Sequence, residues 1–407
     1  MENQNFPGGA GRMKPNISFH VISDTHVDED PKHAYSLNFD QALKDMKKTA
    51  PDCDGIMHVG DVTDSGYPGQ FQTMTEIWNR NKTGLAPMYF TTGNHDVRWA
   101  DFEERMASFR AATGIDRLYY DIWIKGYHFI FLGTEKPLKD CAYLSEEQLA
   151  WFERKMAENA EAVKPIFIFV HEPMKNTVAG SQTRFGWHGI RQDRELKMIL
   201  SKYPQSVVFS GHTHWELGAL DTMYNAKYAT LFNVPSTAYL WTDEDELKKG
   251  SQGYFVEVYD DKVFVRGRDF AEGSWVCDAQ YIVSLPAYIP VVDPVMDPDM
   301  TLSNPSMQLD KQSYITGESI QVTYTGALNH DAVGIFQRGA VPNEVQKVDP
   351  KVFMLTNEVQ QPNGKIVFKD MDLPPGDYDM IYLGETLHVE LTRLPFKVES
   401  KASFQSR

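Results

Sequence analysis

The sequence predicts an α/β domain followed by a smaller all-β domain. From Ile17 onward, short apolar runs alternate with amphipathic segments, a pattern typical of strands in a sheet that helices cover on both faces. After Ser284 the pattern changes to a proline-punctuated stretch and then to short strand-like segments separated by turn residues, which is typical of a β-sandwich. The chain has 407 residues, enough for two domains with separate cores.

The predicted elements of the first domain follow from these periodicities. Apolar runs predict strands near Ile17–Ser23, Gly55–Val59, Pro87–Thr92, Leu118–Ile124, Tyr127–Gly133, Pro165–His171, Ser206–Gly211, Tyr228–Val234, Tyr254–Tyr259 and Lys262–Arg266. Amphipathic runs predict helices near Phe39–Thr49, Gly69–Lys82, Phe102–Ala112, Glu146–Ala162 and Arg191–Lys202. Ser145 followed three residues later by Gln148 predicts a capping box at the start of the fourth helix.

The domain boundaries come from composition. We expect a disordered tail over residues 1–15, the α/β domain over 16–285, a proline-rich linker over 286–300 and the β-sandwich over 301–407. Strands of the sandwich are predicted near Ile320–Thr325, Ala332–Gln337, Lys365–Lys369, Asp377–Leu383 and Leu391–Val398. The segment L-P-P-G-D-Y-D predicts a tyrosine corner with Tyr378 as its ring.

Charge, cysteine content and hydropathy exclude several classes of protein. The formal net charge of -16 argues against binding long nucleic acids, which requires clustered Lys and Arg. Cys53, Cys141 and Cys277 are too few and too far apart for a disulfide framework. The N-terminus has no apolar signal-peptide core, and no apolar run approaches the roughly 20 residues of a membrane helix. We therefore expect a cytoplasmic protein that does not bind membranes.

Five polar motifs each follow a predicted strand. They are Asp24-Thr-His26, Gly60-Asp61, Gly93-Asn94-His95-Asp96, His171 and Gly211-His212-Thr-His214. Ligands of open α/β sheets bind at the carboxyl ends of strands, so these side chains are expected to meet at one edge. A set of oxygen and imidazole ligands without thiolate suits Mn, Fe, Zn or Co. The number of ligands suits two metal ions that share a carboxylate and lie about 3.5–4 Å apart.

This ordered series resembles the calcineurin-like metallophosphoesterase superfamily. The resemblance spans Ile17 to Arg268, and the G-N-H-D form is similar to the class III cyclic-nucleotide phosphodiesterase branch. It implies a four-layer αββα sandwich of two packed mixed sheets. It also implies two divalent metal ions per chain, with Mn or mixed Fe/Mn favoured over Zn. Purple acid phosphatases in the superfamily have a ligating Tyr where this chain has Asp64, so no tyrosinate colour is expected.

The resemblance also implies a role for each motif residue. One metal ion would be bound by Asp24, His26 and His214, and the second by Asn94, His171 and His212. The carboxylate of Asp61 would bridge them. His95 would donate a proton, and Asp64 would hydrogen-bond to His95 and orient it.

Further substrate contacts are less specific. Asn94 is expected to contact a phosphate oxygen, and Arg98, two residues after the G-N-H-D motif, is a candidate for the same role. His188 lies in the loop T-R-F-G-W-H-G-I between two ligand-bearing strands, where ordinary loop packing is the alternative. Tyr67 and Trp215 are candidate walls of the site.

The implied reaction is hydrolysis of a phosphate ester by attack of metal-bound hydroxide, with His95 protonating the leaving alkoxide. The favoured substrate is a small phosphodiester such as a cyclic nucleotide. A phosphomonoesterase, either a nucleotidase or a protein phosphatase, is the alternative because both reactions use the same ligands. A binding protein with a vestigial metal site is a third possibility, which the intact ligand set opposes. The sequence leaves the oligomeric state open.

The C-terminal segment N-H-D-A-V-G-I-F resembles the D-W-x-G-I-F/Y stretch of immunoglobulin-like sandwich domains, with Ala332 at the position of the usual Trp. It carries no catalytic motif. The resemblance implies a domain that packs on the α/β domain or forms a wall of its cleft.

Overall fold

The computed structural model describes residues 14–98, 102–182, 185, 189–288, 305–327, 331–340, 352–354, 363–369, 371–384 and 389–400. Most of the predicted N-terminal tail and of the predicted linker lies outside the described residues. The described part contains no helix that is long and apolar enough to span a membrane.

The first sheet of the α/β domain has six strands in the order β14-β13-β12-β1-β2-β3. The parallel half consists of β1 (Ile17–Ile22), β2 (Gly55–Val59) and β3 (Met88–Thr91). The antiparallel half consists of β12 (Gln252–Val258), β13 (Lys262–Asp269) and β14 (Ser274–Ser284). The sheet is therefore mixed, as the family resemblance implied.

The second sheet has six strands in the order β4-β5-β6-β7-β9-β8. Its parallel strands are β5 (Tyr127–Phe131), β6 (Ile166–Phe169), β7 (Ser206–Ser210) and β9 (Thr230–Asn233). The edge strands β4 (Tyr120–Ile124) and β8 (Met223–Tyr224) run antiparallel to their neighbours. A separate hairpin is formed by β10 (Leu240–Trp241) and β11 (Leu247–Lys248).

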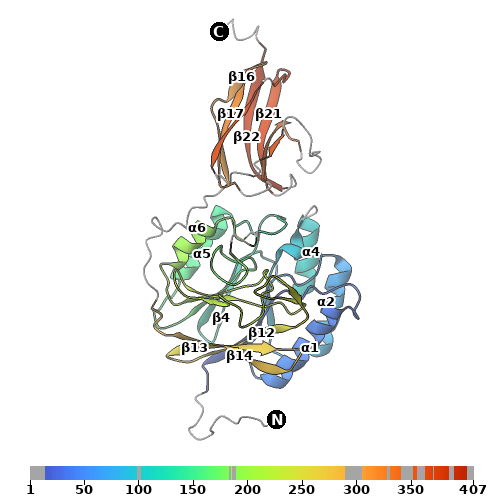
Figure 1. Ribbon diagram of the computed structural model, residues 1–407, viewed down its shortest axis with the longest axis vertical. Helices are drawn as coiled ribbons and strands as arrows, with labels where there is room; N and C mark the ends of the chain where they lie inside the picture. The colour runs from blue at the N-terminus through green and yellow to red at the C-terminus, as the bar shows by residue number, and fades with distance from the viewer. Residues whose placement is uncertain are drawn as a thin grey trace.

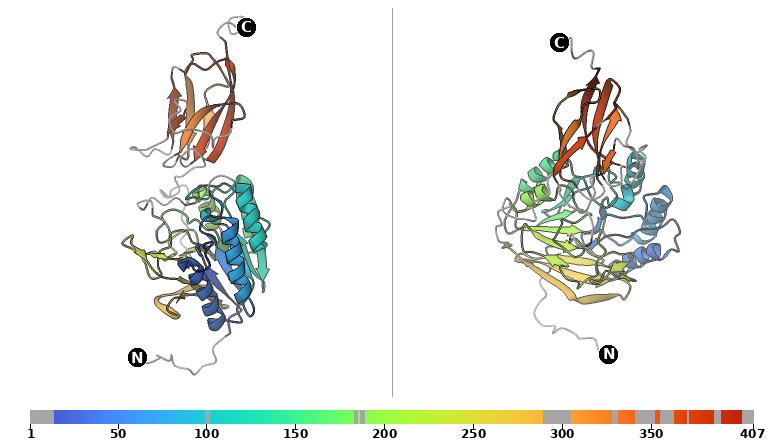
Figure 2. Two further views of the ribbon diagram at one scale, coloured as in Figure 1. Left: turned by 90° about the vertical axis from the view of Figure 1, so that its right-hand side faces the viewer. Right: turned by 45° about the horizontal axis from the view of Figure 1, so that its top comes forward.

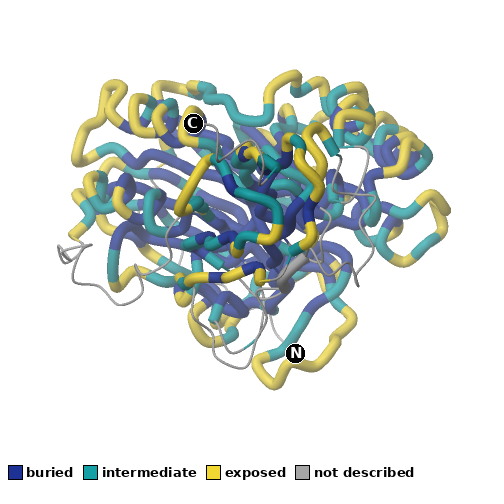
Figure 3. The backbone as a smooth tube through the Cα atoms, turned by 90° about the horizontal axis from the view of Figure 1, so that it is seen from above, coloured by how far each residue is buried: buried dark blue, intermediate teal, exposed yellow. Residues whose placement is uncertain are grey.

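The two sheets pack face to face between helices, which gives four layers. Aromatic rings fill the space between the sheets; for example, Phe19 of β1 contacts Phe129 and Phe167 edge to face at 5.1 and 4.9 Å. The first sheet is covered by α1 (Ala34–Thr49), α2 (Pro68–Asn81) and α4 (Phe102–Thr113). The second is covered by α5 (Glu146–Ala157) and α6 (Asp193–Leu200). Figures 1 and 2 show these helices on opposite sides of the sheets, and in Figure 3 exposed segments lie mainly at the periphery.

Helix α5 differs from the prediction in two ways. It ends at Ala157 rather than near residue 162, because Asn159 adopts a left-handed conformation with φ 52°. Only half of the predicted capping box forms. The Ser145 hydroxyl accepts from the Gln148 amide at 3.1 Å, but the Ser145 amide donates to Glu135 instead. The edge strand β14, whose faces alternate irregularly between buried and exposed residues, was not predicted from the sequence.

The C-terminal strands form two further sheets that share one apolar core. One contains β15 (Ser306–Leu309), β17 (Ile320–Thr325) and β20 (Gly364–Phe368). The other contains β16 (Ser313–Ile315), β18 (Ala332–Gln337), β19 (Val352–Met354), β21 (Gly376–Gly384) and β22 (Val389–Glu399). The hydroxyl of Tyr378 donates to the carbonyl oxygen of Pro374 at 2.9 Å, which confirms the predicted tyrosine corner.

This C-terminal domain packs on the α/β domain at one end of the molecule, near α5 and α6 (Figure 1). The contact includes a buried ion pair between Arg191 and Asp331. Leu138 and Cys141 of the α/β domain are part of the C-terminal apolar core. The expected packing of the two domains is therefore confirmed.

Candidate metal centre

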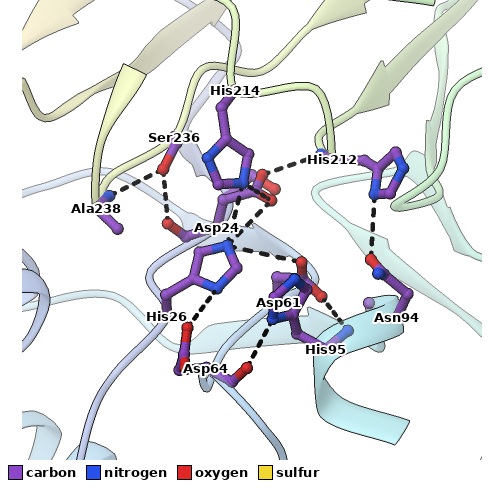
Figure 4. Close-up of polar contacts among 12 residues, drawn as sticks. Asp24, His26, Asp61, Asp64, Asn94, His95, His212, His214, Ser236 and Ala238 are labelled. Atoms are coloured by element: carbon purple, nitrogen blue, oxygen red, sulfur yellow. Dashed lines mark hydrogen bonds and ion pairs between the residues drawn. The ribbon is translucent and has the colours of Figure 1, made fainter. Parts of the chain in front are cut away.

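The five predicted motifs follow the carboxyl ends of β1, β2, β3, β6 and β7. Asp24 and Asp61 lie two residues beyond β1 and β2, and His171 lies two residues beyond β6. Asn94 begins the short helix α3 (Asn94–Val97) after β3. These strands come from both sheets, so the ends of the sheets converge on one site (Figure 4).

Four of the side chains form a first compact group: Asp24, His26, Asp61 and His214. One ligand atom from each lies within 4.8 Å of the others. Nε2 of His214 lies 2.9 Å from Oδ1 of Asp24 and 3.1 Å from Nε2 of His26. All four residues are buried, so a cation among them would be shielded from bulk water.

A second group contains Asp61, His171 and His212, and shares the Asp61 carboxylate with the first. Nε2 of His171 lies 3.2 Å from Oδ2 of Asp61. Asn94 adjoins this group, because its Oδ1 lies 3.1 Å from Nδ1 of His212. The structure thus brings all seven predicted ligands together in two groups that overlap at Asp61.

The backbone is strained at most of these positions. Positive φ angles occur at Asp24 (53°), His26 (42°), Asp61 (49°), His212 (71°) and His214 (60°). Such conformations cost about 1–3 kcal/mol each and cluster at functional sites. They turn the chain sharply after each strand, so that side chains from neighbouring strand ends face one another.

Two glycines allow the close approach of these turns. A Cβ on Gly93 would lie 2.2 Å from Oδ1 of Asp61, and a Cβ on Gly211 would lie 2.5 Å from Oδ2 of Asp24. Neither position can accept a larger residue without displacing a carboxylate of the site. The glycines of the G-N-H-D and G-H-T-H motifs are therefore needed for packing against the two aspartates.

Hydrogen bonds from outside the groups orient the ligands. Nδ1 of His171 lies 2.7 Å from the carbonyl oxygen of Val59, which requires a proton on Nδ1 and leaves Nε2 as the electron-pair donor. The backbone amide of His212 donates to Oδ2 of Asp24 at 3.1 Å. The hydroxyl of Ser236 donates to the carbonyl oxygen of Asp24 at 2.9 Å. Such outer contacts fix ligand orientation in metal sites.

The electrostatics of the groups favour a cation. Burial alone would raise the pKa of Asp24, but His214 and His171 hold it well below its usual range, so the carboxyl is ionised. Burial opposes protonation of His26, but Asp24 and Asp64 raise its pKa to about 9. A proton on His26 thus compensates part of the carboxylate charge. A metal ion would take over that compensation and release the proton.

The donor set therefore fits metal ions. Oδ1 of Asp24 and Nε2 of His171 are buried and lie close only to other candidate ligands, Nε2 of His214 at 2.9 Å and Oδ2 of Asp61 at 3.2 Å, without a well-oriented hydrogen bond to a described residue. Buried polar atoms are normally satisfied, so atoms that point into one space without a partner indicate a missing ligand. Carboxylate, amide and imidazole donors at this spacing suit divalent transition metals.

His95 lies outside the two groups that share Asp61, but together with His26 and Asp64 it forms a third group whose ligand atoms lie within 4.8 Å of one another. Its ring is 4.5 Å from that of His26, and its backbone amide donates to Oδ1 of Asp61 at 2.8 Å. Burial lowers the pKa of His95 to about 4, and Asp61 partly opposes this shift. Nδ1 of His95 lies 2.6 Å from the main-chain carbonyl oxygen of Asp64.

The predicted hydrogen bond between His95 and Asp64 is present, and it is formed by the main chain of Asp64. The bond uses the backbone of Asp64, whereas the Asp64 carboxylate faces His26, with 3.5 Å between Oδ1 and Nδ1. Asp64 hydrogen-bonds to Val27 through its own amide, which turns its carbonyl toward His95. Sequence spacing could identify the pair but not the atoms that join it.

Comparisons with known proteins agree with this geometry. The family model for calcineurin-like phosphoesterases matches residues 17–216. These residues belong to the calcineurin-like phosphoesterase family. The chain is 26% identical over 223 residues to the 3',5'-cyclic adenosine monophosphate phosphodiesterase CpdA of Escherichia coli, covering 53% of this chain and 74% of CpdA. It is 25% identical over 207 residues to the 3',5'-cyclic-nucleotide phosphodiesterase alr5338 of Nostoc sp., covering 50% of this chain and 69% of that protein.

The fold of this phosphoesterase is also found among solved structures. Purple acid phosphatase PPD1 from yellow lupin aligns with a TM-score of 0.50 and 15% identity, over 66% of this chain and 55% of the lupin chain. At that identity the similarity shows the fold alone. The family match over residues 17–216 and the two bacterial relatives support a metal-dependent phosphoric ester hydrolase domain that is similar to cyclic-nucleotide phosphodiesterases.

The structure places the other residues that were predicted to contact substrate or to form walls of the phosphoesterase site as follows. Arg98 is half-buried directly after α3, and its charge contributes to lowering the pKa of His95, so it lies near the site. His188 lies outside the described residues. Trp215 is 1% exposed and packs against Phe185, and its place in a wall of the site stays a prediction. Tyr67 is half-exposed, and the guanidinium of Arg105 lies over its ring.

Three residues beside the phosphoesterase site were not predicted from the sequence. The ring of Tyr239 lies 4.4 Å from that of His214 and 5.3 Å from that of Tyr35. Ser236 supports Asp24 as described above. Ser236 and Tyr239 follow β9, so the strand-end argument could have found them, although no metal-binding residue type marks that segment.

Proposed function

We propose that this phosphoesterase hydrolyses a small phosphodiester, such as a cyclic nucleotide, at a dinuclear metal centre. The observation that carries the proposal is the pair of ligand groups that overlap at Asp61. A shared carboxylate is the usual means of holding two cations close enough to act on one phosphate. The names of the two bacterial relatives favour a cyclic-nucleotide substrate.

In this proposal Asp24, His26 and His214 hold one metal ion, and Asn94, His171 and His212 hold the other, with Asp61 between them. Two ions held by these ligands would supply Lewis-acid stabilisation of the phosphate oxygens and a nucleophile at neutral pH. Mn or a mixed Fe/Mn pair suits the ligand set, and Zn is also compatible with it. Asn94 and Arg98 are the proposed contacts to the phosphate.

His95 is the proposed proton donor to the leaving oxygen. Its bond to the Asp64 carbonyl requires a proton on Nδ1, so Nε2 is the atom that can exchange a proton with substrate. The negative charge of a bound phosphodiester favours the protonated ring, and the low pKa makes that ring a strong acid. Protonation of an alkoxide leaving group by such a group typically contributes about 10²–10⁴-fold to rate.

Tyr35 and Tyr239 are the proposed contacts to the organic part of the substrate. Their half-buried rings lie 5.3 Å apart, and Tyr239 also packs on His214, so the pair extends from the metal ligands toward solvent. Aromatic side chains stack on bases of any sequence, because every base has a π-face. A nucleobase is therefore a suitable leaving-group substituent for this site.

The C-terminal domain is proposed to be an immunoglobulin-like sandwich. Its two sheets share one core, and the Tyr378 corner is the feature that supports the assignment.

Metal analysis and a substrate panel would test the function. Protein purified without chelators should contain two divalent ions per chain, and Asp61→Ala should lose both metal and activity. The panel should compare cyclic nucleotides and linear diesters with the corresponding monoesters at saturating Mn²⁺. A higher kcat/KM for monoesters would favour the phosphomonoesterase alternative, and one tightly bound ion in active protein would contradict the dinuclear centre.

A further inference from the structure

The loop between β5 and α5, residues 134–143, contacts the metal centre through the main chain of Lys139. Nδ2 of Asn94 donates a hydrogen bond to the carbonyl oxygen of Lys139. The other arm of the amide, Oδ1, points toward His212. An amide offers only its oxygen to a cation, so the bond to Lys139 holds Asn94 in the orientation that a metal ligand requires.

The same loop is part of the core of the C-terminal domain. Leu138 and Cys141 are completely buried and share an apolar cluster with residues of β18, β21 and β22. Nζ of Lys136 donates to the carbonyl oxygen of Glu390 at 2.7 Å. Lys139 is therefore flanked on both sides by residues that the C-terminal domain holds.

A buried ion pair fixes the domain next to this loop. The guanidinium of Arg191 donates to both carboxylate oxygens of Asp331 at 2.9 and 2.6 Å, and both side chains are at most 1% exposed. The hydroxyl of Tyr382 donates to the same carboxylate at 3.2 Å. The amide of Arg191 donates to the carbonyl oxygen of Ala142 at 2.9 Å, which ties the ion pair to the end of the loop.

This ion pair makes a displaced domain costly. If the domain moved, Arg191 and Asp331 would be left as buried charges without partners, which strongly destabilises a protein. The bidentate hydrogen bonds between them also restrict the pair to one geometry. The domain therefore has one favoured position on the loop, set by the Arg191–Asp331 pair and by the packing of Leu138.

We infer that the C-terminal domain positions a metal ligand: by packing on residues 136–141 it holds the Lys139 carbonyl where it orients Asn94. The inference rests on the proposed role of Asn94 as a ligand. Lys139, Leu138 and the Arg191–Asp331 pair are positioning residues in this arrangement, because each acts through Asn94. The domain then affects the metal site that contains Asn94 more than the site that contains His26.

The test is calorimetric titration of metal-free, full-length protein with Mn²⁺. Leu138→Ala loosens the loop from the C-terminal domain, and Ile366→Ala is the matched control because it removes apolar volume from the same core away from the loop. We expect Leu138→Ala to weaken one of the two Mn²⁺ affinities by about 10–100-fold, as lost outer-shell support typically does. The other affinity, and both affinities of Ile366→Ala, should equal those of the wild type.

A milder variant keeps the inference testable if Leu138→Ala fails to fold. Lys136→Met removes the bond to the Glu390 carbonyl at a partly exposed position and leaves both cores intact. It should weaken the same Mn²⁺ affinity in the same direction, by less. The inference would be overturned if the folded variants had wild-type Mn²⁺ affinities. It would also be overturned if both Mn²⁺ affinities of a variant were weakened equally, or if Ile366→Ala weakened Mn²⁺ binding as much as Leu138→Ala. Because the readout is metal affinity, the result does not depend on which ester the enzyme hydrolyses.

Discussion

His95 and Asp64 are joined by a hydrogen bond between an imidazole nitrogen and a main-chain carbonyl, with 2.6 Å between Nδ1 and the oxygen. A carbonyl holds the ring in place but carries no net charge, so it raises the pKa of His95 less than a carboxylate would, and burial keeps that pKa low. The Asp64 carboxylate faces His26 instead. The main chain of Asp64 thus contacts the proposed proton donor, and its side chain contacts a proposed metal ligand.

His95→Ala should lower kcat by about 10²–10⁴-fold for cyclic nucleotides, because the alkoxide then leaves without a proton. The loss should be much smaller for a diester with a p-nitrophenolate leaving group, which needs little protonation. Steady-state kinetics on both substrates, with metal content measured on the same samples, would check this. The control is His128→Ala, a histidine stacked on Trp123 away from the site. If His95→Ala loses its metal ions, His95 is a ligand and its proposed role is wrong.

Asp64→Ala should affect metal binding rather than proton transfer. The substitution keeps the main-chain carbonyl that orients His95 but removes the carboxylate beside His26. Loss of such a second carboxylate typically costs about 10–100-fold in metal affinity. At saturating Mn²⁺ the variant should therefore retain the wild-type ratio of rates between poor and good leaving groups. A ratio like that of His95→Ala would mean that the carboxylate, not the carbonyl, sets the function of His95.

Tyr239→Leu should raise KM for a cyclic nucleotide by about 5- to 150-fold, because stacking on a base contributes roughly 1–3 kcal/mol. KM for ribose 3',5'-cyclic phosphate, which has no base, should stay close to the wild-type value. Tyr239→Phe is the matched control, since it keeps the ring and removes only the hydroxyl. Equal increases in KM for both substrates would show that Tyr239 supports His214 rather than the base.

The sequence predicted most of the α/β fold and the position of every proposed ligand. The five motifs could be placed because apolar strands with buried faces are distinctive and each motif follows one of them directly. The irregular edge strand β14 gave no such pattern. The ion pair between Arg191 and Asp331 was also not predictable, because the two residues are 140 positions apart and each resembles an ordinary surface charge in the sequence.

The sequence also could not predict whether Asp64 contacts His95 through its main chain or through its side chain. It depends on the turn after Asp61, whose φ of 49° sets the direction of the following peptides. Likewise, Tyr239 is an unremarkable residue in V-P-S-T-A-Y, and only the fold brings its ring to His214. The proposed metal ligands could be predicted because Asp, Asn and His are typical metal-binding residues. Contacts made by residue types without such a role could be found only in the structure.

His20 should make the stability of the protein depend on pH. The residue is 1% exposed in β1, and burial lowers its pKa from 6.5 to about 4, with Asp45 partly opposing the shift. In the unfolded chain His20 takes up a proton as the pH falls through 6.5, whereas the folded protein resists protonation down to about 4. Protonation therefore favours the unfolded state, and stability from this group is lost as the pH falls between these values.

The expected loss between pH 7 and pH 5 is about 2 kcal/mol in the free energy of unfolding, at about 1.4 kcal/mol per pKa unit. Urea unfolding of metal-free wild type and His20→Leu at both pH values would measure it. His58, whose pKa burial also lowers, is present in both proteins and cancels in the comparison. His20→Leu should lose about 2 kcal/mol less than the wild type over this interval. Identical pH dependence in the two proteins would show that His20 is not protonated on unfolding in this range.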